Sequence, residues 1–146
     1  MKNYGVGLFY NSKKGYIFAA DTTIGKLPMR TAVDPVTILP STATFDELTQ
    51  ALSDSLTVSE NAQPISREKA REYKYWQKLG MKTFSAFSKN FSHVRVLFLG
   101  DCYQVSKWIR EDRGSYAPSS APGDEQVLDT PASAQQIMQQ VLELLD

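Results

Sequence analysis

The chain has 146 residues, and its 16 basic side chains balance its 16 acidic ones. This length suits one domain, 1–146, because a chain of this size buries roughly 70% of the surface that its unfolded form exposes. The zero net charge argues against a dominant basic surface for nucleic acid and against an acidic mimic of DNA. The single cysteine, Cys102, excludes an internal disulfide framework and fits a reducing compartment.

Neither end of the chain predicts targeting to a membrane. The first ten residues, MKNYGVGLFY, contain a lysine but no sustained apolar run and no cleavage site of small residues. No stretch approaches the roughly 20 apolar residues that a membrane-spanning helix needs. We therefore expect a cytoplasmic protein with no membrane partner.

The N-terminal third predicts strands. Gly5–Tyr10 and Tyr16–Thr23 are rich in apolar and aromatic residues, and the turn between them contains Asn11 and Gly15, so we expect a hairpin. Residues 29–39 are largely extended, with a bulge, edge or break at Asp34-Pro35, because proline cannot donate a hydrogen bond to a neighbouring strand.

The next segment predicts two helices. Thr44 and Glu47 match a capping box, and Leu48, Leu52 and Leu56 follow at helical spacing, so a helix begins after Thr44 and is expected to end near Thr57. A polar loop then runs to residue 64. Residues 66–78 predict a second helix, part of which can be irregular because its aromatic residues are too consecutive to share one face.

The clearest hydrophobic pattern lies between residues 80 and 100. Phe84, Phe87 and Phe91 recur at helical spacing and predict a short helix over 82–90. Residues 94–99 read Val-Arg-Val-Leu-Phe-Leu and predict a buried central strand. Gly100-Asp101 then forms a hairpin turn into a return strand over 102–109.

The C-terminal part predicts a loop, a short strand and a helix. Residues 110–123 contain two glycines and two prolines and read as a loop, 126–128 as a short strand, and 131–145 as a final amphipathic helix. Its spacing of Ser133, Ile137, Val141 and Leu145 repeats that of the first helix. The fold class is therefore α+β, with mostly antiparallel sheets and amphipathic helices packed on them. The repeat leaves two readings open: two ordinary amphipathic helices, or two units of strands followed by a helix.

The chain contains no recognisable catalytic, cofactor or metal-binding motif. One histidine, His93, and one thiol, Cys102, could form a nucleophilic arrangement with Asp101, but a lone strand histidine and a buried thiol explain them as well. No phosphate-binding glycine motif occurs, and no ligand spacing supports zinc. We expect no enzyme activity, no cofactor and no metal.

Residues 66–95 carry eight basic and two acidic side chains, interleaved with aromatic residues. Aromatic rings can stack on bases while cations track phosphates, so this composition is compatible with binding of single-stranded nucleic acid. Phe84 and Phe87, however, already have core spacing. Nucleic-acid binding is therefore the alternative function and not the one we expect.

The segment Leu79-Gly80-Met81-Lys82-Thr83-Phe84-Ser85-Ala86-Phe87-Ser88-Lys89 is similar to a motif LG-x-K-[ST]-x-x-x-F-x-K. Together with the strand, return strand and acidic loop that follow, it resembles the immunity proteins of contact-dependent growth inhibition (the CdiI family). The helix TFDELTQALSDSL and the amphipathic C-terminal helix extend the resemblance over most of the chain. Thr49 departs from it, since members often have glycine there.

The resemblance implies a cytoplasmic protein that binds the C-terminal toxin domain of a CdiA-type effector, often a nuclease, and neutralises it. It also implies a fold like that of some members, which resemble Whirly domains in having two strand-rich units that are each followed by a helix. A stoichiometric inhibitor needs no catalytic group.

The partner surface is expected in and around the loop 110–123, because loops on a rigid scaffold commonly carry function and the fold does not explain this one. Acidic side chains here could complement the basic groove of a nuclease. The predicted partner-binding residues are Trp108, Arg110, Glu111, Asp112, Arg113, Tyr116, Asp124 and Glu125.

Overall fold

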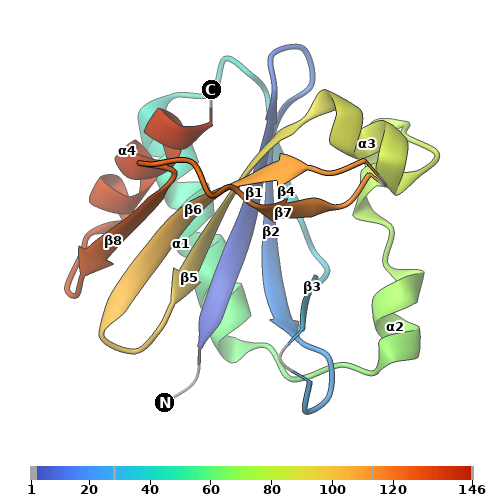
Figure 1. Ribbon diagram of the computed structural model, residues 1–146, viewed down its shortest axis with the longest axis horizontal. Coiled ribbons are helices and arrows are strands. Elements are labelled where there is room, and N and C mark those ends of the chain that lie inside the picture. The colour runs from blue at the N-terminus through green and yellow to red at the C-terminus, as the bar shows by residue number, and fades with distance from the viewer. Residues whose placement is uncertain (1–2, 28, 113, 146) are drawn as a thin grey trace.

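Eight strands form one curled, antiparallel sheet in the computed structural model, which describes residues 3–27, 29–112 and 114–145 (Figure 1). The main path through the sheet runs β3-β2-β1-β5-β6-β7, while β4 also pairs with β2 and β8 with β6. The strands are β1 (Tyr4–Asn11), β2 (Gly15–Thr23), β3 (Arg30–Ala32), β4 (Thr37–Leu39), β5 (Ser92–Phe98), β6 (Cys102–Arg110), β7 (Tyr116–Pro118) and β8 (Glu125–Asp129).

Helices pack on both faces of this sheet. Figure 1 shows α1 and α4 together on one face, and α2 and α3 on the other side of the molecule. The helical segments are α1 (Phe45–Asn61), α2 (Arg67–Glu72), the 3₁₀ helix η1 (Tyr75–Leu79), α3 (Phe84–Asn90) and α4 (Ala134–Leu144). The predicted α+β class with antiparallel pairing is confirmed.

The two halves of the sheet repeat one plan. In the first half β2 pairs with β1 on one side and with β3 and β4 on the other; in the second half β6 pairs with β5 on one side and with β7 and β8 on the other. Helix α1 follows the first four strands and α4 follows the second four. Both helices begin with a capping box, at Thr44 and at Ser133. The spacing shared by the two helices therefore does mark two units of strands followed by a helix.

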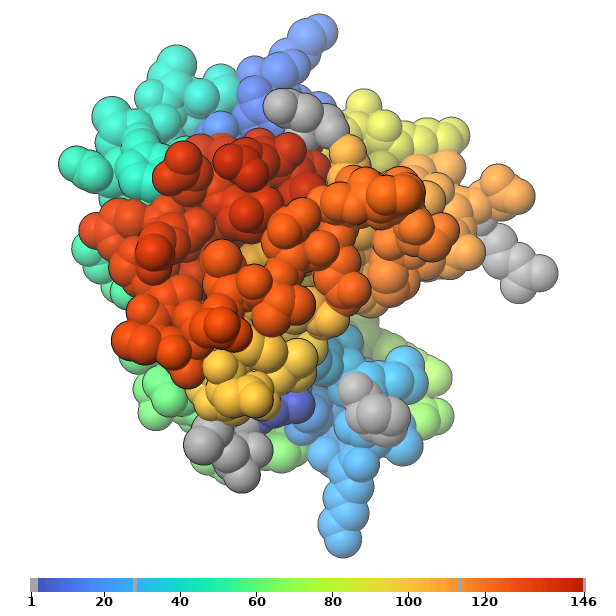
Figure 2. Space-filling model, turned by 60° about the vertical axis from the view of Figure 1, so that its left-hand side comes forward, coloured from blue at the N-terminus to red at the C-terminus, as the bar shows by residue number. Residues whose placement is uncertain are grey.

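The main core lies between the sheet and the pair α1 and α4. Alternate strand residues point into it, because side chains of a strand alternate between its faces. The fully buried members include Val6, Leu8, Val94, Val96 and Val105 from the strands, with Leu52, Ile137 and Val141 from the helices. In Figure 2, α4 in red lies beside the orange segment that leads to it through β7 and β8.

A second, smaller core lies on the opposite face of the sheet. It brings Phe9 and Ile17 of the strands against Tyr75 of η1 and against Phe87 and Phe91 of the α3 segment. Phe87 stacks on Phe91 and meets Phe9 edge to face, with ring centroids 4.6 and 5.0 Å apart. The phenylalanine spacing therefore predicted this face of α3 correctly.

Helix α1 is longer than predicted, since it continues past Thr57 to Asn61. The reason is Ser59, which is fully buried although the local sequence is polar. Its hydroxyl accepts a hydrogen bond from the backbone N–H of Gly5 (2.8 Å) and donates one to the carbonyl oxygen of Asp21 (2.6 Å). A tertiary contact to β1 and β2 thus extends a helix that local composition would end.

The two other differences concern the segments that flank α3. The helix expected over 66–78 divides into α2 and η1, with Tyr73 in an extended conformation between them. The loop expected over 110–123 contains strand β7, which pairs with the end of β6. In both places aromatic side chains, Tyr75 and Tyr116, pack against the second core, and this packing decides the local conformation.

None of the helices in the described part of the chain is long and apolar enough to cross a membrane.

The buried hydroxyl of Ser59 generates a prediction about stability. Ser59→Ala removes the acceptor of the Gly5 N–H and leaves both backbone groups unpaired in the interior, so it is expected to lower the free energy of unfolding by about 1–3 kcal/mol. Thr57→Ala, on the exposed side of the same helix, is the matched control and should change it by less than about 0.5 kcal/mol. Urea denaturation measures both, and equal effects of the two variants would contradict this role for Ser59.

Candidate functional site

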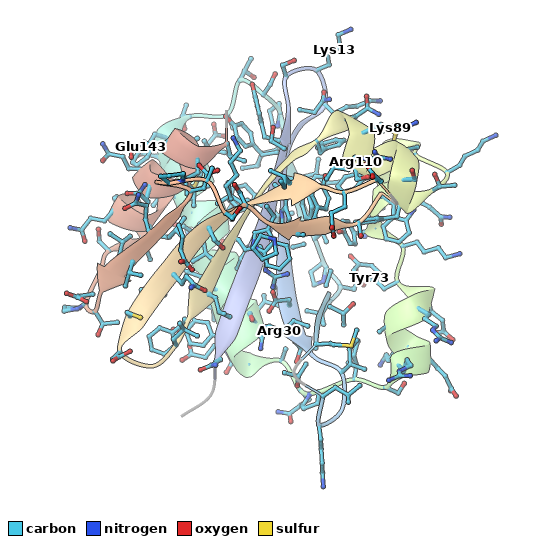
Figure 3. The ribbon with its side chains drawn as sticks, in the orientation of Figure 1. Lys13, Arg30, Tyr73, Lys89, Arg110 and Glu143 are labelled. Carbon is cyan, nitrogen blue, oxygen red and sulfur yellow. The ribbon has the colours of Figure 1, made fainter. Side chains whose placement is uncertain are left out.

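A pocket of about 350 Å³ opens on the second face of the sheet, where helices do not cover its middle. Its floor comes from β1, β2, β5 and β6, one wall from β3, and the others from α2, η1, α3 and β7. Figure 3 shows Arg30 on β3 and Tyr73 just after α2, two of the lining residues.

Two glycines of β1, near the floor of this pocket, allow neighbouring groups to lie close to the strand. A Cβ atom at Gly5 would lie 2.7 Å from the backbone oxygen of Val96, and one at Gly7 would lie 3.1 Å from Cε1 of His93. Both positions lie on the pocket side of the strand, where larger side chains would displace the neighbouring strand or the histidine ring. The glycine pair of the sequence therefore serves close packing within the sheet, and it is not part of a phosphate-binding loop.

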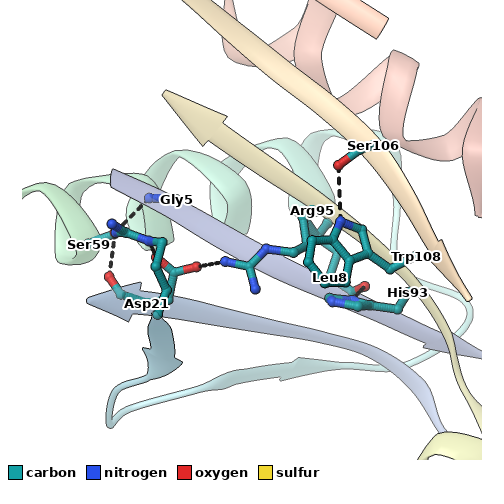
Figure 4. Close-up of polar contacts among 9 residues, drawn as sticks. Gly5, Leu8, Asp21, Ser59, His93, Arg95, Ser106 and Trp108 are labelled. Atoms are coloured by element: carbon teal, nitrogen blue, oxygen red, sulfur yellow. Dashed lines mark hydrogen bonds and ion pairs between the residues drawn. The ribbon is translucent and has the colours of Figure 1, made fainter. Parts of the chain in front are cut away.

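A buried carboxylate joins two arginines across the floor of the pocket. Figure 4 shows its contact with one of them, Arg95. Asp21 on β2 is 3% exposed and accepts a hydrogen bond at 2.6 Å from Nε of Arg30, and a second, through its other oxygen, from Nη2 of Arg95. Arg95 also lies over the ring of Trp108, with its guanidinium carbon 5.3 Å from the centroid. The Trp108 indole in turn donates to Oγ of Ser106 at 3.1 Å.

The two halves of the sheet are related by a pseudo-twofold axis that passes between Gly7 and Arg95, which pair directly across β1 and β5. These two positions are 88 residues apart, and the same difference in number relates Gly5 of the first half to His93 of the second. Because Gly5 pairs with Asp21 and His93 pairs with Trp108, Asp21 and Trp108 are equivalent positions of the two halves. The side chain of Arg95 thus spans from an ion pair in one half to a cation–π contact in the other.

His93 is part of the pocket wall and is held as a neutral ring. It stacks on Phe9 with centroids 4.1 Å apart, and its Nδ1 lies 2.9 Å from the carbonyl oxygen of Leu8. Since a carbonyl oxygen can only accept, Nδ1 carries the ring proton. Burial, and secondarily the positive charge of Arg95, lower the pKa of His93 to about 3.

The predicted partner-binding residues divide into three groups. Trp108 and Tyr116 line the pocket. Glu111 and Asp112 are exposed in the turn between β6 and β7, while Asp124 and Glu125 lie at the start of β8. Arg113 lies outside the described residues.

Arg110 holds the turn between β6 and β7 against α3. It donates to the hydroxyl oxygens of Ser88 (2.9 Å) and Ser85 (3.0 Å), close to α3 in Figure 3. The Tyr116 hydroxyl donates to the carbonyl oxygen of Phe91 at 2.8 Å. A Cβ atom at Gly114 would meet Cβ of Ser85 at 3.0 Å, which shows how closely the turn approaches the helix. This segment is therefore a fixed rim of the pocket.

Asp124 and Glu125 engage neighbouring polar groups. Asp124 accepts a hydrogen bond from the hydroxyl of Ser119 at 2.6 Å, and Glu125 accepts one from Gln104. Glu125 pairs with Ser106 in the β6–β8 ladder, so it lies on the pocket face of the sheet. Both acidic residues belong to the border of this face.

Two of the charged pocket residues stand out in the sequence, although the interface prediction did not include them. Arg95 is the one charge in the apolar run of the central strand, and Asp21 is the one charge in the second strand. A single acid and a single base in two strands that are otherwise buried predict a buried ion pair, because a lone charge in such a place is costly. Arg30 lacks such a signal, since its segment is polar.

The residues considered for catalysis do not come together. His93 pairs with Trp108, whereas Cys102 lies six positions away along β6, about 20 Å at the rise of a strand. No group of three or more possible metal ligands occurs within the described ranges of the chain. The chemistry that the pocket offers is recognition by arginine, aromatic and hydrogen-bonding groups.

The aromatic residues of the basic segment 66–95 are largely occupied. Phe87 is fully buried, Tyr75 is 8% exposed, and Trp76 and Phe84 pack edge to face with centroids 5.1 Å apart. These rings build the second core and the pocket wall, so they do not form a row of free faces on which successive bases could stack.

No protein-family profile matches the sequence, and no curated protein matches it either. Several solved chains share its fold. A protein of unknown function from Neisseria meningitidis superposes with a TM-score of 0.75 at 20% identity, over 99% of this chain and 94% of its own. A chain of a CdiA-CT/CdiI toxin and immunity complex from Yersinia pseudotuberculosis superposes with a TM-score of 0.74 at 12% identity, over 99% of this chain and 96% of its own.

The buried histidine generates a prediction about pH. Because the pKa of His93 is about 3 in the folded protein and near 6.5 in an unfolded chain, protonation favours the unfolded chain between these values. The contribution of neutral His93 to the free energy of unfolding is therefore complete above pH 6.5. As the pH falls below this value, the free energy of unfolding decreases by up to about 1.4 kcal/mol per pH unit. Denaturation of the wild type and of His93→Gln between pH 7 and 4.5 measures it: the variant should lose this part of the slope, and parallel pH profiles would contradict the prediction.

Proposed function

We propose that this protein is an immunity protein of a contact-dependent growth inhibition system, which binds a cognate toxin domain and blocks it without catalysing a reaction. The observation that carries the proposal is the fold shared, over 99% of the chain, with a chain of a CdiA-CT/CdiI toxin and immunity complex. The motif at residues 79–89 supports it independently, because it resembles the same family at the level of sequence.

The arrangement of the sheet suits a stoichiometric inhibitor. One face, with α1 and α4, contains the main core and supplies the stability of the scaffold. The other face presents a pocket with arginine and aromatic side chains, the groups that most often anchor protein interfaces. Ser115 and Tyr116 line the pocket, so its rim continues into the acidic turn with Glu111 and Asp112. The proposed interface consists of the pocket and this turn.

The proposed partner is the C-terminal toxin domain of a CdiA-type effector, and a nuclease fits the acidic turn best. Nuclease domains bind a polyanion and therefore carry basic surfaces, which exposed carboxylates can complement. Such an immunity protein would act in the cytoplasm, where a delivered nuclease meets its substrate.

The experiment is to purify this chain with the toxin domain encoded immediately upstream of its gene. Calorimetry should give a one-to-one complex, and expression of the chain should protect cells that produce the toxin. An upstream gene that encodes no toxin fragment, or a toxin domain that binds this chain no more tightly than an unrelated protein, would contradict the proposal.

The acidic turn gives a prediction within this proposal. Reversal of both charges, Glu111→Lys with Asp112→Lys, should weaken toxin binding about 5- to 50-fold, mainly through slower association, with the melting temperature unchanged because both side chains are exposed. Asp54→Lys with Glu143→Lys makes the same charge change on exposed positions of α1 and α4 and should leave affinity unchanged. Surface plasmon resonance at two salt concentrations measures this, and equal kinetics for both double variants would remove the turn from the interface.

A further inference from the structure

The pocket carries more positive than negative charge. Among the described residues, three arginines line it, Arg30, Arg71 and Arg95, whereas Asp21 is the one carboxylate and His93 is neutral. Asp21 interacts with Arg30 and with Arg95, so its single charge is shared between two guanidinium groups. Arg71 is exposed on α2, and no ion pair to it occurs among the described residues. The lining therefore has a surplus of two positive charges.

The two arginines on the floor keep free hydrogen-bond donors. A guanidinium group has five N–H donors, and Arg30 and Arg95 each direct one at Asp21. Their side chains are only 13% and 21% exposed, and both residues line the pocket. The indole N–H of Trp76, another lining residue, is buried and has no acceptor in the described part of the chain. Donors that a ligand could engage, two guanidinium groups and one indole N–H, therefore line this pocket.

The remaining walls are aromatic and apolar. Phe9, Tyr75, Phe84 and Trp108 contribute rings, and Ala19 and Ala32 contribute small side chains. Water exclusion by such walls strengthens a charge-assisted hydrogen bond to an arginine. A ligand that fits both features has an acceptor group with negative charge next to an apolar group.

We propose that this pocket is a carboxylate site, which receives an Asp or Glu side chain of the protein partner together with an adjacent apolar residue. The inference rests on the proposed function for the source of the carboxylate and adds the chemistry of the contact. The partner then presents an acidic group to the pocket and a basic surface to the acidic turn beside it, which fixes its orientation.

Geometry favours a carboxylate from a protein over a phosphate from nucleic acid. Asp21 already demonstrates that these guanidinium groups bind carboxylate oxygens in this environment. The pocket has a volume of about 350 Å³, which suits one or two side chains better than several successive nucleotides. Its aromatic residues pack on one another and on Arg95, so they offer walls for one side chain and not platforms for successive bases.

The chain offers a direct readout, because its two tryptophans, Trp76 and Trp108, both line the pocket. The experiment titrates the whole protein with phenylacetate, which joins a carboxylate to an apolar ring, and follows the two indole N–H signals by NMR. Phenylacetamide is the neutral probe of the same shape, and phenyl phosphate is the phosphate probe. We expect saturable, millimolar binding of phenylacetate that shifts both indole signals, and at least tenfold weaker binding of phenylacetamide.

Variants assign the binding to the arginines. Arg71→Gln changes an exposed residue and should weaken phenylacetate binding about 3-fold, while Arg30→Gln leaves Asp21 paired with Arg95 and should weaken it about 10-fold. Lys13→Gln, in the exposed turn between β1 and β2, is the control and should have no effect. Melting temperatures verify that each variant is folded.

Three results of these titrations would contradict the proposal. Equal binding of phenylacetate and phenylacetamide, or unchanged binding in both arginine variants, would mean that the pocket does not select a carboxylate. Phenyl phosphate binding more than tenfold tighter than phenylacetate would assign the site to phosphate.

The assignment to a partner is tested separately with the upstream toxin domain, whose exposed Asp and Glu residues are changed one at a time to Asn and Gln. One of these toxin variants should bind the wild-type protein more weakly than the unchanged toxin does. The same toxin variant and the unchanged toxin should bind the Arg71→Gln protein with nearly equal affinity. A toxin domain that does not bind at all would contradict the proposed function, while the titration would still decide the carboxylate site.

Discussion

The carboxylate of Asp21 is the interaction on which the second face of the sheet depends. Asp21 is 3% exposed and lies between Arg30 and Arg95, whose guanidinium groups compensate its buried charge. The same carboxylate holds Arg95 across the sheet, together with the ring of Trp108. Gly7 pairs with Arg95 in the β1–β5 ladder, and a side chain at Gly7 would meet the rings of His93 and Phe9 beside the pocket. The ion pair and the pocket therefore occur together. Strand β1 has glycines at positions 5 and 7, and the middle of this face is left to the pocket and the Arg95 side chain.

The pseudo-twofold plan explains how one small chain separates stability from recognition. Both halves contribute four strands and a capped helix, and α1 and α4 close the main core on the same face. In the described part of the chain, no second helix pair of this kind covers the opposite face. The connection between the halves, with α2, η1 and α3, covers only one end of it. The symmetry is broken at the pocket, where Asp21 of one half is equivalent to Trp108 of the other, so that Arg95 meets a charge on one side and a ring on the other.

Sequence patterns predicted the elements whose cause is local, and missed those whose cause is a tertiary contact. The two capping boxes and the leucine and phenylalanine spacings located α1, α3 and α4, and the repeat between the two halves was visible in them. The end of α1 depends on Ser59 binding backbone groups of distant strands, and β7 depends on Tyr116 packing across the sheet, neither of which composition records. The same limit applies to the site. Trp108 and Tyr116 were included for their residue types, whereas Arg30, Asp21 and Arg95 form a site only because the register of three strands brings them together.

A double-mutant cycle on Asp21 and Arg95 tests the central claim most directly. Urea denaturation of the wild type, Asp21→Asn, Arg95→Gln and the double variant gives the coupling free energy between the two side chains. If the carboxylate and the arginine hold each other in place, each single variant leaves a buried charge uncompensated, the double variant costs less than the sum of the two, and the coupling exceeds about 1 kcal/mol. Free energies that add within about 0.5 kcal/mol would show that Arg95 crosses the sheet without need of Asp21, and would contradict the account.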